Sequence, residues 1–186
     1  MASGATIFKA TLQIADLDRN YYRDHALTIA RHPSETDERM MLRLLAFVRH
    51  AHEALVFGRG LSTDDEPDLW QKDLTGAIAL WIDLGQRDAR DIRRACGRAE
   101  RVILYAYGGR GVDLWWTQNR DELERLDNLT VWRLDAETSR NLARLAQRTM
   151  ALQCTVQEGQ VWIGNADETV PVELAELKAA SRPVGR

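Results

Sequence analysis

The sequence contains no apolar run close to the ~20 residues that a membrane-spanning helix requires, and its first residues do not resemble a signal peptide. It also contains only two cysteines in 186 residues, which does not suit the disulfide framework of a secreted domain. Cys96 and Cys154 each fall on the apolar side of an expected element, so we interpret them as reduced core thiols. These features predict a cytoplasmic protein.

Several motifs that would indicate a known chemistry are also absent. There is no GxSxG nucleophile motif, and the glycine-rich segment 108–111 lacks the lysine and Ser/Thr of a P-loop, so it predicts a plain turn. The histidines do not have the spacing of zinc ligands; they are His25, His32, His50 and His52. We expect His52, on the apolar stripe of a helix, to be a core residue.

Charge and composition set further limits. The net charge of −3 does not favour a nucleic-acid binder that depends on overall charge, so such a function requires a local basic patch. A hydrophobic content of 45% with 28% charged residues is ordinary for a globular protein, which argues against disorder. Since no repeat, linker or low-complexity segment divides the chain, we expect a single domain over 1–186.

The amino-terminal part predicts a β-hairpin followed by a helix. Apolar and polar residues alternate over 5–16, and a polar turn separates this strand from a second one over 21–30. Ser34 is expected to cap a helix over 34–54. The apolar stripe of this helix consists of Met41, Leu44, Leu45, Val48, His52 and Leu55.

The rest of the chain predicts alternating strands and helices. In chain order we expect a strand over 56–61, an acidic loop over 64–68, a buried strand over 78–84, a helix over 88–99 capped by Asp88, a strand over 102–107, a strand over 129–134, a helix over 136–147, strands over 149–157 and 161–163, and a frayed tail after Leu177. The strand–helix–strand unit predicts a parallel pair. The fold class is α/β, with a mixed sheet and flanking helices.

Asp83 is a carboxylate inside the otherwise apolar segment 78–84. Burying it without compensation would be costly. Two interpretations remain open. Asp83 accepts hydrogen bonds from loop amides near the strand end, or it binds a divalent metal at the carboxyl end of a central strand, where open α/β sheets bind ligands.

An acidic run precedes this strand. We interpret Asp64 and Asp65 as solvated loop residues. Glu66 and Asp68 are candidate ligands because the buried carboxylate follows them on an adjacent expected strand. Pro67 restricts the backbone of its neighbours and can present Asp68 at a fixed angle.

Glu38 is a third candidate, because it lies in the first turn of the expected helix at the edge of the apolar stripe. Its alternative role is favourable charge at a helix amino end; Glu35 has the same alternative and lies further from the stripe. Converging carboxylates suit Mg²⁺ or Mn²⁺, which prefer oxygen ligands. The predicted metal ligands are therefore Asp83, Asp68, Glu66 and Glu38.

A basic ridge is expected on the helix that begins near Asp88. It consists of Arg90, Arg93, Arg94 and Arg98, with Arg87 and Arg101 at its ends. Two interpretations apply: a solvated helix face, or a surface that holds nucleic-acid phosphates if the ridge lies beside the carboxylates.

Five segments of the sequence resemble the YaeQ family of bacterial proteins, and the resemblance covers nearly the whole chain. They are ATIFKATLQIADLDRNYY, LTIARHPSETDERMMLRLLAFV, RGLSTDDEPDLW, LWIDLG and TMALQCTVQEGQVWI. The resemblance implies an α/β fold containing a variation of the PD-(D/E)XK nuclease motif, with an αβββαβ core over about residues 34–107. Pro67 and Asp68 would correspond to the PD pair, Asp83 to the following acid, and Glu38 to the helix acid.

One part of that motif is missing. Two positions after the acid, where the motif has lysine, this sequence has Gly85. Glycine has no side chain that could stabilise negative charge. The resemblance makes the next residue, Gln86, a candidate, and Lys72, Arg87 or Lys9 could supply a group from elsewhere in space.

Three hypotheses follow. In the first, the protein is a Mg²⁺- or Mn²⁺-dependent nuclease with a rearranged site. In the second, it is a catalytically inactive nuclease-fold protein that binds nucleic acid or a protein partner in a regulatory role. In the third, the carboxylates only cap helices and loops, and function lies on another surface.

Overall fold

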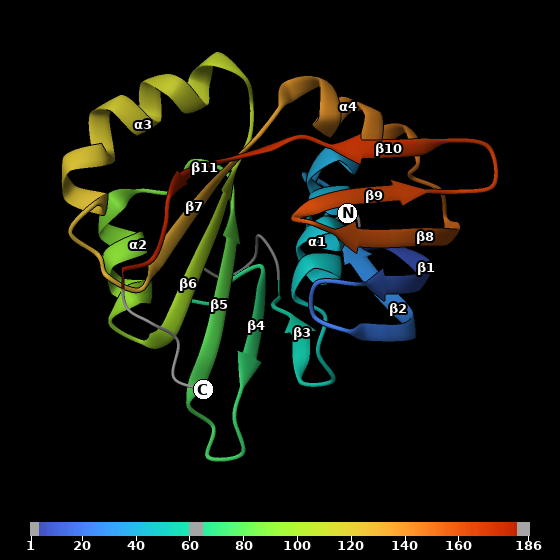
Figure 1. The fold of residues 1–186 in the computed structure, drawn as a ribbon, viewed down its shortest axis with the longest axis horizontal. Helices are drawn as coiled ribbons and strands as arrows, with labels where there is room; N and C mark the ends of the chain where they lie inside the picture. The colour runs from blue at the N-terminus through green and yellow to red at the C-terminus, as the bar shows by residue number, and fades with distance from the viewer. Residues whose placement is uncertain (1–3, 60–64, 182–186) are drawn as a thin grey trace. The chain divides into compact units, whose positions relative to one another are not determined.

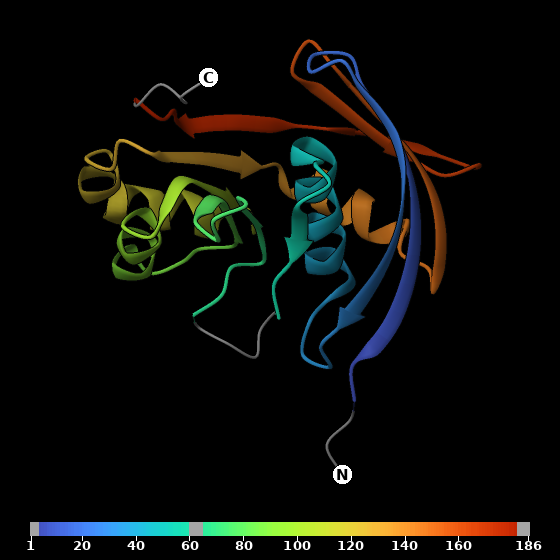
Figure 2. The ribbon, with the colours of Figure 1, turned by 90° about the horizontal axis from the view of Figure 1, so that it is seen from below.

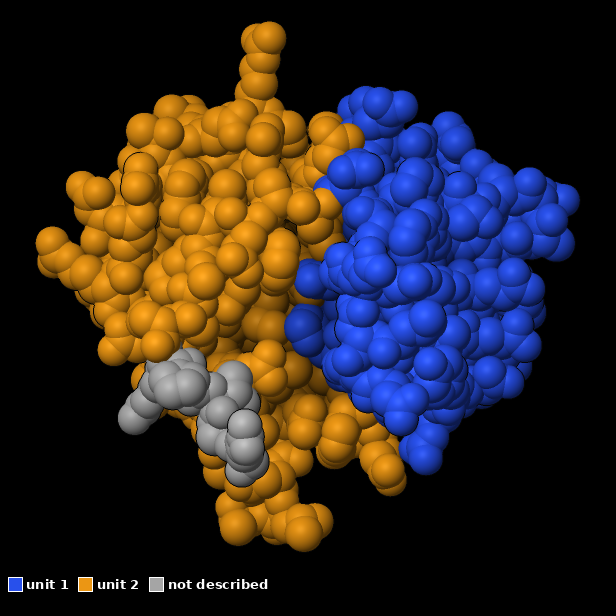
Figure 3. All heavy atoms as spheres, viewed as in Figure 1, with its two compact units in different colours: residues 1–51, 137–173 blue, residues 52–136, 174–186 orange. Residues whose placement is uncertain are grey.

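A computed structural model describes residues 4–59 and 65–181 of the chain. Its contacts divide the chain into two compact units, 1–51 with 137–173 and 52–136 with 174–186 (Figure 3). Each unit is therefore assembled from segments that are distant in sequence. The expectation of one domain over 1–186 stays a prediction.

Unit 1 is built on a five-stranded mixed sheet in the order β10-β9-β8-β1-β2, with helices α1 and α4 (Figure 1). Only the β1/β8 pair is parallel. The elements are β1 (Thr6–Asp16), β2 (Tyr21–Arg31), α1 (Asp37–His50), α4 (Ala136–Arg144), β8 (Thr149–Gln157), β9 (Gln160–Gly164) and β10 (Thr169–Val172). The predicted amino-terminal hairpin is confirmed.

The core of unit 1 follows the alternation of β1. The side chains of Phe8, Ala10, Leu12 and Ile14 are buried, while the residues between them are exposed. Every residue of α1 from Arg39 to Val48 is buried, so this helix is enclosed rather than amphipathic.

Unit 2 is built on a six-stranded mixed sheet in the order β11-β7-β6-β5-β4-β3, in which β5, β6 and β7 are parallel. Its elements are β3 (Leu55–Phe57), β4 (Leu69–Lys72), β5 (Ile78–Leu84), α2 (Ala89–Cys96), β6 (Ala99–Ala106), α3 (Arg110–Leu123), β7 (Leu129–Leu134) and β11 (Leu174–Lys178). The predicted parallel pair formed by 78–84 and the following strand is confirmed.

The core of unit 2 joins the helices to the sheet. Ile92 and Ala95 of α2 pack with Trp81 of β5 and Val131 of β7. Trp115 and Trp116 of α3 are half-buried and pack against the same cluster.

The structure corrects several expectations at helix ends. The cap of α1 is Thr36, whose side chain accepts from the Arg39 amide, because Ser34 Oγ is engaged by His32 Nδ1 at 2.6 Å. The helix ends at His50, so His52 lies beyond it and is exposed, not a core residue. Asp88 does cap α2, as predicted.

Further corrections concern the glycine-rich segment and the sheets. Residues 108–111 are not a plain turn throughout, because α3 begins at Arg110. The α/β class is confirmed, but there are two mixed sheets rather than one. Strands β4, β10 and β11 are additional to the prediction, and β11 occupies part of the tail that we expected to be frayed. The predicted strand over 56–61 and loop over 64–68 fall partly outside the described residues.

None of the described helices is both long enough and apolar enough to cross a membrane.

Candidate functional site

Two carboxylates meet at the end of the β4/β5 pair in unit 2. In the antiparallel register Leu69 lies opposite Ile82, which places Asp68, just before β4, opposite Asp83 near the end of β5. Both are buried, with 2% of Asp68 and 9% of Asp83 exposed. The structure therefore brings together the two acids that the sequence indicated as the central pair.

Each of these carboxylates has a dedicated hydrogen-bond donor. Trp81 Nε1 donates to Asp83 Oδ2 at 2.8 Å, and the backbone amide of Leu84 donates to Asp68 Oδ2 at 2.8 Å. The donors come from β5 itself, so formation of the sheet orients the pair. Such donors partly offset the cost of burying the charges.

The cation at this site is Arg87. Its Nη2 lies 3.5 Å from Asp68 Oδ2 and 3.4 Å from Asp83 Oδ1. These separations are long for charge-assisted hydrogen bonds, and the Nε atom of Arg87 is buried with no partner among the described residues. One guanidinium, a third of whose side chain is exposed, thus serves two acids.

The electrostatics of the pair follow from this arrangement. Burial raises the pKa of Asp83 above its ordinary value, Arg87 opposes that rise, and the neighbouring Asp68 carboxylate adds to it. Removing a carboxyl from water disfavours its charged form, and one shared arginine at more than 3 Å does not offset the effect.

The turn after β5 explains why an arginine occupies this place. Gly85 has φ +90°, a conformation that a lysine side chain would rarely adopt, and its amide donates to Tyr105 O at 2.8 Å. Trp115 Nε1 on α3 donates to Arg87 O at 2.8 Å and holds the turn in place. The turn therefore disfavours lysine at the motif position, and Arg87, two residues on, reaches the acids.

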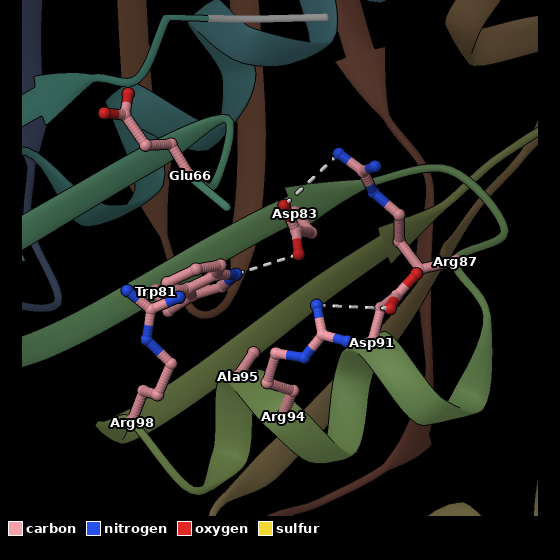
Figure 4. Close-up of a pocket in the computed structure, with 8 residues that line it drawn as sticks. All are labelled: Glu66, Trp81, Asp83, Arg87, Asp91, Arg94, Ala95 and Arg98. Atoms are coloured by element: carbon pink, nitrogen blue, oxygen red, sulfur yellow. Dashed lines mark hydrogen bonds and ion pairs between the residues drawn. The ribbon is translucent and has the colours of Figure 1, made fainter. Parts of the chain in front are cut away.

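A small cavity of about 30 Å³ adjoins Asp83 and is lined by residues of β5 and α2, by Arg87 and Arg98 on either side of α2, and by Glu66. This is the volume of about one water molecule. Figure 4 shows Asp83 between Trp81 and Arg87, with Arg98 lying over the Trp81 ring, 5.2 Å from its centroid. Arg94 approaches Asp91 at 3.8 Å on the helix side of the cavity.

Other predicted site residues lie in unit 2 but are engaged elsewhere. Glu66 accepts from the Arg59 amide at 3.1 Å, and its carboxylate points away from Asp83 (Figure 4). Gln86 Nε2 donates to the Tyr107 carbonyl at 2.7 Å. The Nζ atom of Lys72 lies 3.9 Å from the Trp70 ring centroid.

The register separates Lys72 from the acid pair, because Lys72 lies opposite Ile78 at the other end of β4 and β5. Glu38 and Lys9 belong to unit 1. There the Glu38 carboxylate accepts a short hydrogen bond from Ser139 Oγ, and Lys9 lies on β1, opposite Thr28. Of the groups considered as substitutes for the motif lysine, Arg87 is the one placed at both acids.

We tested whether the acids fit a metal ion. In the described ranges 4–59 and 65–181, no three or more His, Cys, Asp and Glu side chains gather as metal ligands would. The two acids that do meet already share the Arg87 guanidinium, whose positive charge stands where a metal ion would balance the carboxylates. Of the four predicted ligands, Asp68 and Asp83 lie together, and a metal at this pair stays a prediction.

The basic ridge on α2 is exposed but partly engaged. Arg93 pairs with Glu122 of α3 at 2.8 Å, and Arg98 donates to the Asp65 carbonyl at 3.2 Å. Arg90 and Arg94 face solvent. The ridge thus begins beside the acid pair, at Arg87, and follows α2 away from it.

Sequence reasoning missed a buried charge cluster in unit 1. Glu35, expected to lie away from the apolar face, is only 6% exposed and binds two arginines of α1. Arg43 donates to both Glu35 oxygens at 2.9 and 2.7 Å, and Arg39 donates at 3.2 Å. The spacing of four residues between successive members is the signal that could have found this cluster.

The cysteines play no part in the acid-pair site. Burial raises the pKa of both Cys96 and Cys154 to about 12, so each thiol is protonated at neutral pH and is a weak nucleophile.

Comparison with known proteins supplies the family. The family model described as YaeQ protein matches residues 1–174. The YaeQ proteins of Salmonella typhi and Escherichia coli (strain K12) are each 48% identical over 181 residues, covering 97% of this chain and 100% of the relative.

Solved structures agree with this match. The YaeQ crystal structure from Xanthomonas axonopodis pv. citri has a TM-score of 0.91 at 46% identity and covers 94% of this chain and 99% of its own. The YaeQ structure from Pseudomonas syringae also has a TM-score of 0.91, at 36% identity, with coverage of 96% and 98%. The chain belongs to the YaeQ family.

Proposed function

We propose that this protein is a nuclease-like, cytoplasmic protein that binds nucleic-acid phosphates through α2, and that Arg87 replaces a metal ion at its acid pair. One observation carries the proposal: Arg87 lies within 3.5 Å of both Asp68 and Asp83, and it begins the basic segment of the chain.

The chain order of the elements supports a nuclease-like core. The segments α1, β3, β4, β5, α2 and β6 follow one another as helix, three strands, helix and strand. This is the αβββαβ order that the resemblance implies. Asp68 immediately precedes the second of the three strands and Asp83 lies in the third, where the motif's two acids would stand.

The charge at the acid pair favours binding over metal-dependent cleavage. Mg²⁺ can be held by one or two carboxylates together with waters and substrate phosphates. Here the two carboxylates already share Arg87, and Gly85 stands at the lysine position.

The basic segment supplies the phosphate-binding surface. Residues 87–101 contain six arginines and three acids, a local charge of +3 in a chain whose net charge is −3. The pairs of Arg93 with Glu122 and Arg94 with Asp91 are exposed, and such pairs contribute little in water. Phosphates can compete for these arginines.

Fluorescence anisotropy with labelled single- and double-stranded DNA and RNA, over a range of salt concentrations, tests the proposal. Replacing Arg90 and Arg94 with alanine should weaken binding. The slope of the logarithm of affinity against the logarithm of salt concentration should become shallower by about 0.9 for each phosphate that the variant no longer neutralises. Arg140→Ala on α4, also an exposed arginine, is the matched control and should leave affinity unchanged.

Two results would contradict the proposal. One is the absence of binding by the folded wild-type protein to all four nucleic acids, which would favour a protein partner. The other is an equal loss of affinity in the Arg140→Ala control, which would assign the effect to overall charge.

The second candidate function is a Mg²⁺- or Mn²⁺-dependent nuclease, and the juxtaposition of Asp68 and Asp83 at the end of β5 favours it. Calorimetry with Mn²⁺ and Mg²⁺ on the wild type and on Asp83→Asn separates the two functions. Our proposal expects no metal binding and no cleavage. Metal binding and cleavage that are both lost in Asp83→Asn would establish the nuclease instead.

A further inference from the structure

One face of the sheet in unit 1 is not covered by any described element of that unit. Figure 2 shows α1 and α4 on one side of this curved sheet and no described helix of unit 1 on the other. The register agrees with this view. Inward residues such as Leu12 and Leu152 are buried, whereas their outward neighbours Thr11, Gln13 and Gln153 are exposed.

The outward face is poor in charge. Alanine, threonine and glutamine predominate on it, and only Lys9 and Asp24 are charged among the residues that the register places there. In contrast, 28% of the whole chain is charged. Ile7 and Tyr22, which are 48% and 61% exposed, also lie on this face. Depletion of charge and exposed apolar anchors are typical of the centre of a protein interface.

The two charges are placed so that the face complements itself. Lys9 lies opposite Thr28 and Asp24 lies opposite Gln13, so the charges are four positions apart along neighbouring strands. This corresponds to about 13 Å along the strands and about 4.8 Å across them. Consider a two-fold axis that lies in the plane between two facing copies, passes over the midpoint between Lys9 and Asp24, and is perpendicular to the line joining them. Rotation about this axis would place each Lys9 against Asp24 of the partner subunit.

The same axis gives a favourable packing angle. The line joining Lys9 and Asp24 is inclined by about 20° to the strands. After the two-fold rotation, the strands of one copy therefore cross those of the other at about 40°. Aligned sheet packing favours about 30°. Charge pairing and sheet packing are therefore compatible in one arrangement.

We propose that this face is the interface between two copies of the chain, packed sheet on sheet about an axis near Thr11 and Ala26. The two ion pairs set the register, and the small uncharged side chains between them allow close approach. This proposal does not depend on the proposed nucleic-acid function, because it involves different residues in the other unit.

Sedimentation equilibrium over a range of concentrations tests it, using the full chain as wild type, Lys9→Asp, Asp24→Lys and the double charge exchange. The wild type should have the mass of two chains. Each single reversal places like charges together at both pairs and should weaken association at least about tenfold. The double exchange should restore it, and Arg140→Glu on α4 should have no effect.

Circular dichroism and thermal melting of every variant establish that each is folded. A wild type that is a single chain at all concentrations would overturn the proposal and leave the face open or available to another partner. Wild-type association that is insensitive to the single reversals, or that the double exchange does not restore, would also overturn it.

Discussion

The two units each contain a buried cluster of arginines and carboxylates, and the clusters have opposite balances of charge. In unit 1 one acid, Glu35, is bound by two arginines, Arg39 and Arg43, and the Arg43 contacts are 2.7 and 2.9 Å. In unit 2 two acids share Arg87, at 3.4 and 3.5 Å.

The difference separates a structural cluster from a candidate functional one. Both oxygens of Glu35 are bonded within the fold, and the contacts are short, as in a cluster that fixes the chain before α1. At Asp83 the Arg87 contact does not offset the cost of burial, and the pKa of this carboxyl is raised. A buried carboxyl with a raised pKa, beside a cavity and a loosely held arginine, is typical of functional sites.

Breaking the structural cluster should have the largest effect. Glu35→Gln leaves two arginines beside an uncharged group in a buried site, and we expect a loss of about 3–5 kcal/mol in the free energy of unfolding, measured with urea. The control is Glu168→Gln, which removes the exposed pair with Arg144 and should cost less than about 1 kcal/mol. Equal losses in the two variants would show that burial does not distinguish the pairs.

Removing the shared arginine should have a smaller effect. Arg87→Met removes the cation that Asp68 and Asp83 share, but a third of the Arg87 side chain is exposed. We therefore expect a loss of about 1–2 kcal/mol at neutral pH, discounted for solvent screening. In an Asp83→Asn background the loss should shrink, because one of the two charges is gone; an unchanged loss would mean that Arg87 stabilises the fold independently of the pair.

Neutralising Asp83 alone should have the smallest effect, with the opposite sign. Since burial raises the folded-state pKa of Asp83, the folded protein binds this proton more tightly than the unfolded chain does. This tighter proton binding contributes to the free energy of unfolding at low pH, and the contribution is lost as the pH rises through the pKa of Asp83 in the folded protein. Asp83→Asn, whose amide oxygen can still accept from Trp81, should therefore be more stable than the wild type at neutral pH.

Thermal melting of both proteins across the acidic range checks this expectation. The advantage of Asp83→Asn should disappear as the pH falls below the ordinary aspartate value, where the wild-type carboxyl is protonated in both states. A variant that is less stable than the wild type at neutral pH would contradict the prediction, because it would mean that the Arg87 contact outweighs the cost of burial.

The strands with strong local patterns were predictable from the sequence. The predicted bounds 78–84, 129–134 and 149–157 coincide with β5, β7 and β8. β5 is a long apolar run and β8 alternates strictly, and such patterns depend on which faces are buried. The Asp88 cap of α2 was predictable for the same reason, since capping depends on neighbouring backbone amides.

Short elements were not predictable in the same way. β4, β10 and β11 have four or five residues each, too few for a period to emerge, and they exist because a neighbouring strand pairs with them. Helix α3 was not predicted at all, and it begins after Gly109, a cap that makes no side-chain hydrogen bond. His52 matched the helical period, but its helix had already ended at His50.

The sequence by itself determined the α/β class and the main strands, and it indicated Asp68 and Asp83 as a pair, because periodicity and a buried charge are properties of short segments. Only the tertiary structure decided that Arg87, rather than Lys72, Gln86 or Lys9, meets both acids. It also decided that Glu35 is buried between two arginines. Strand register and the conformation of the Gly85 turn bring these groups together, and neither is encoded in the spacing of residues along the chain.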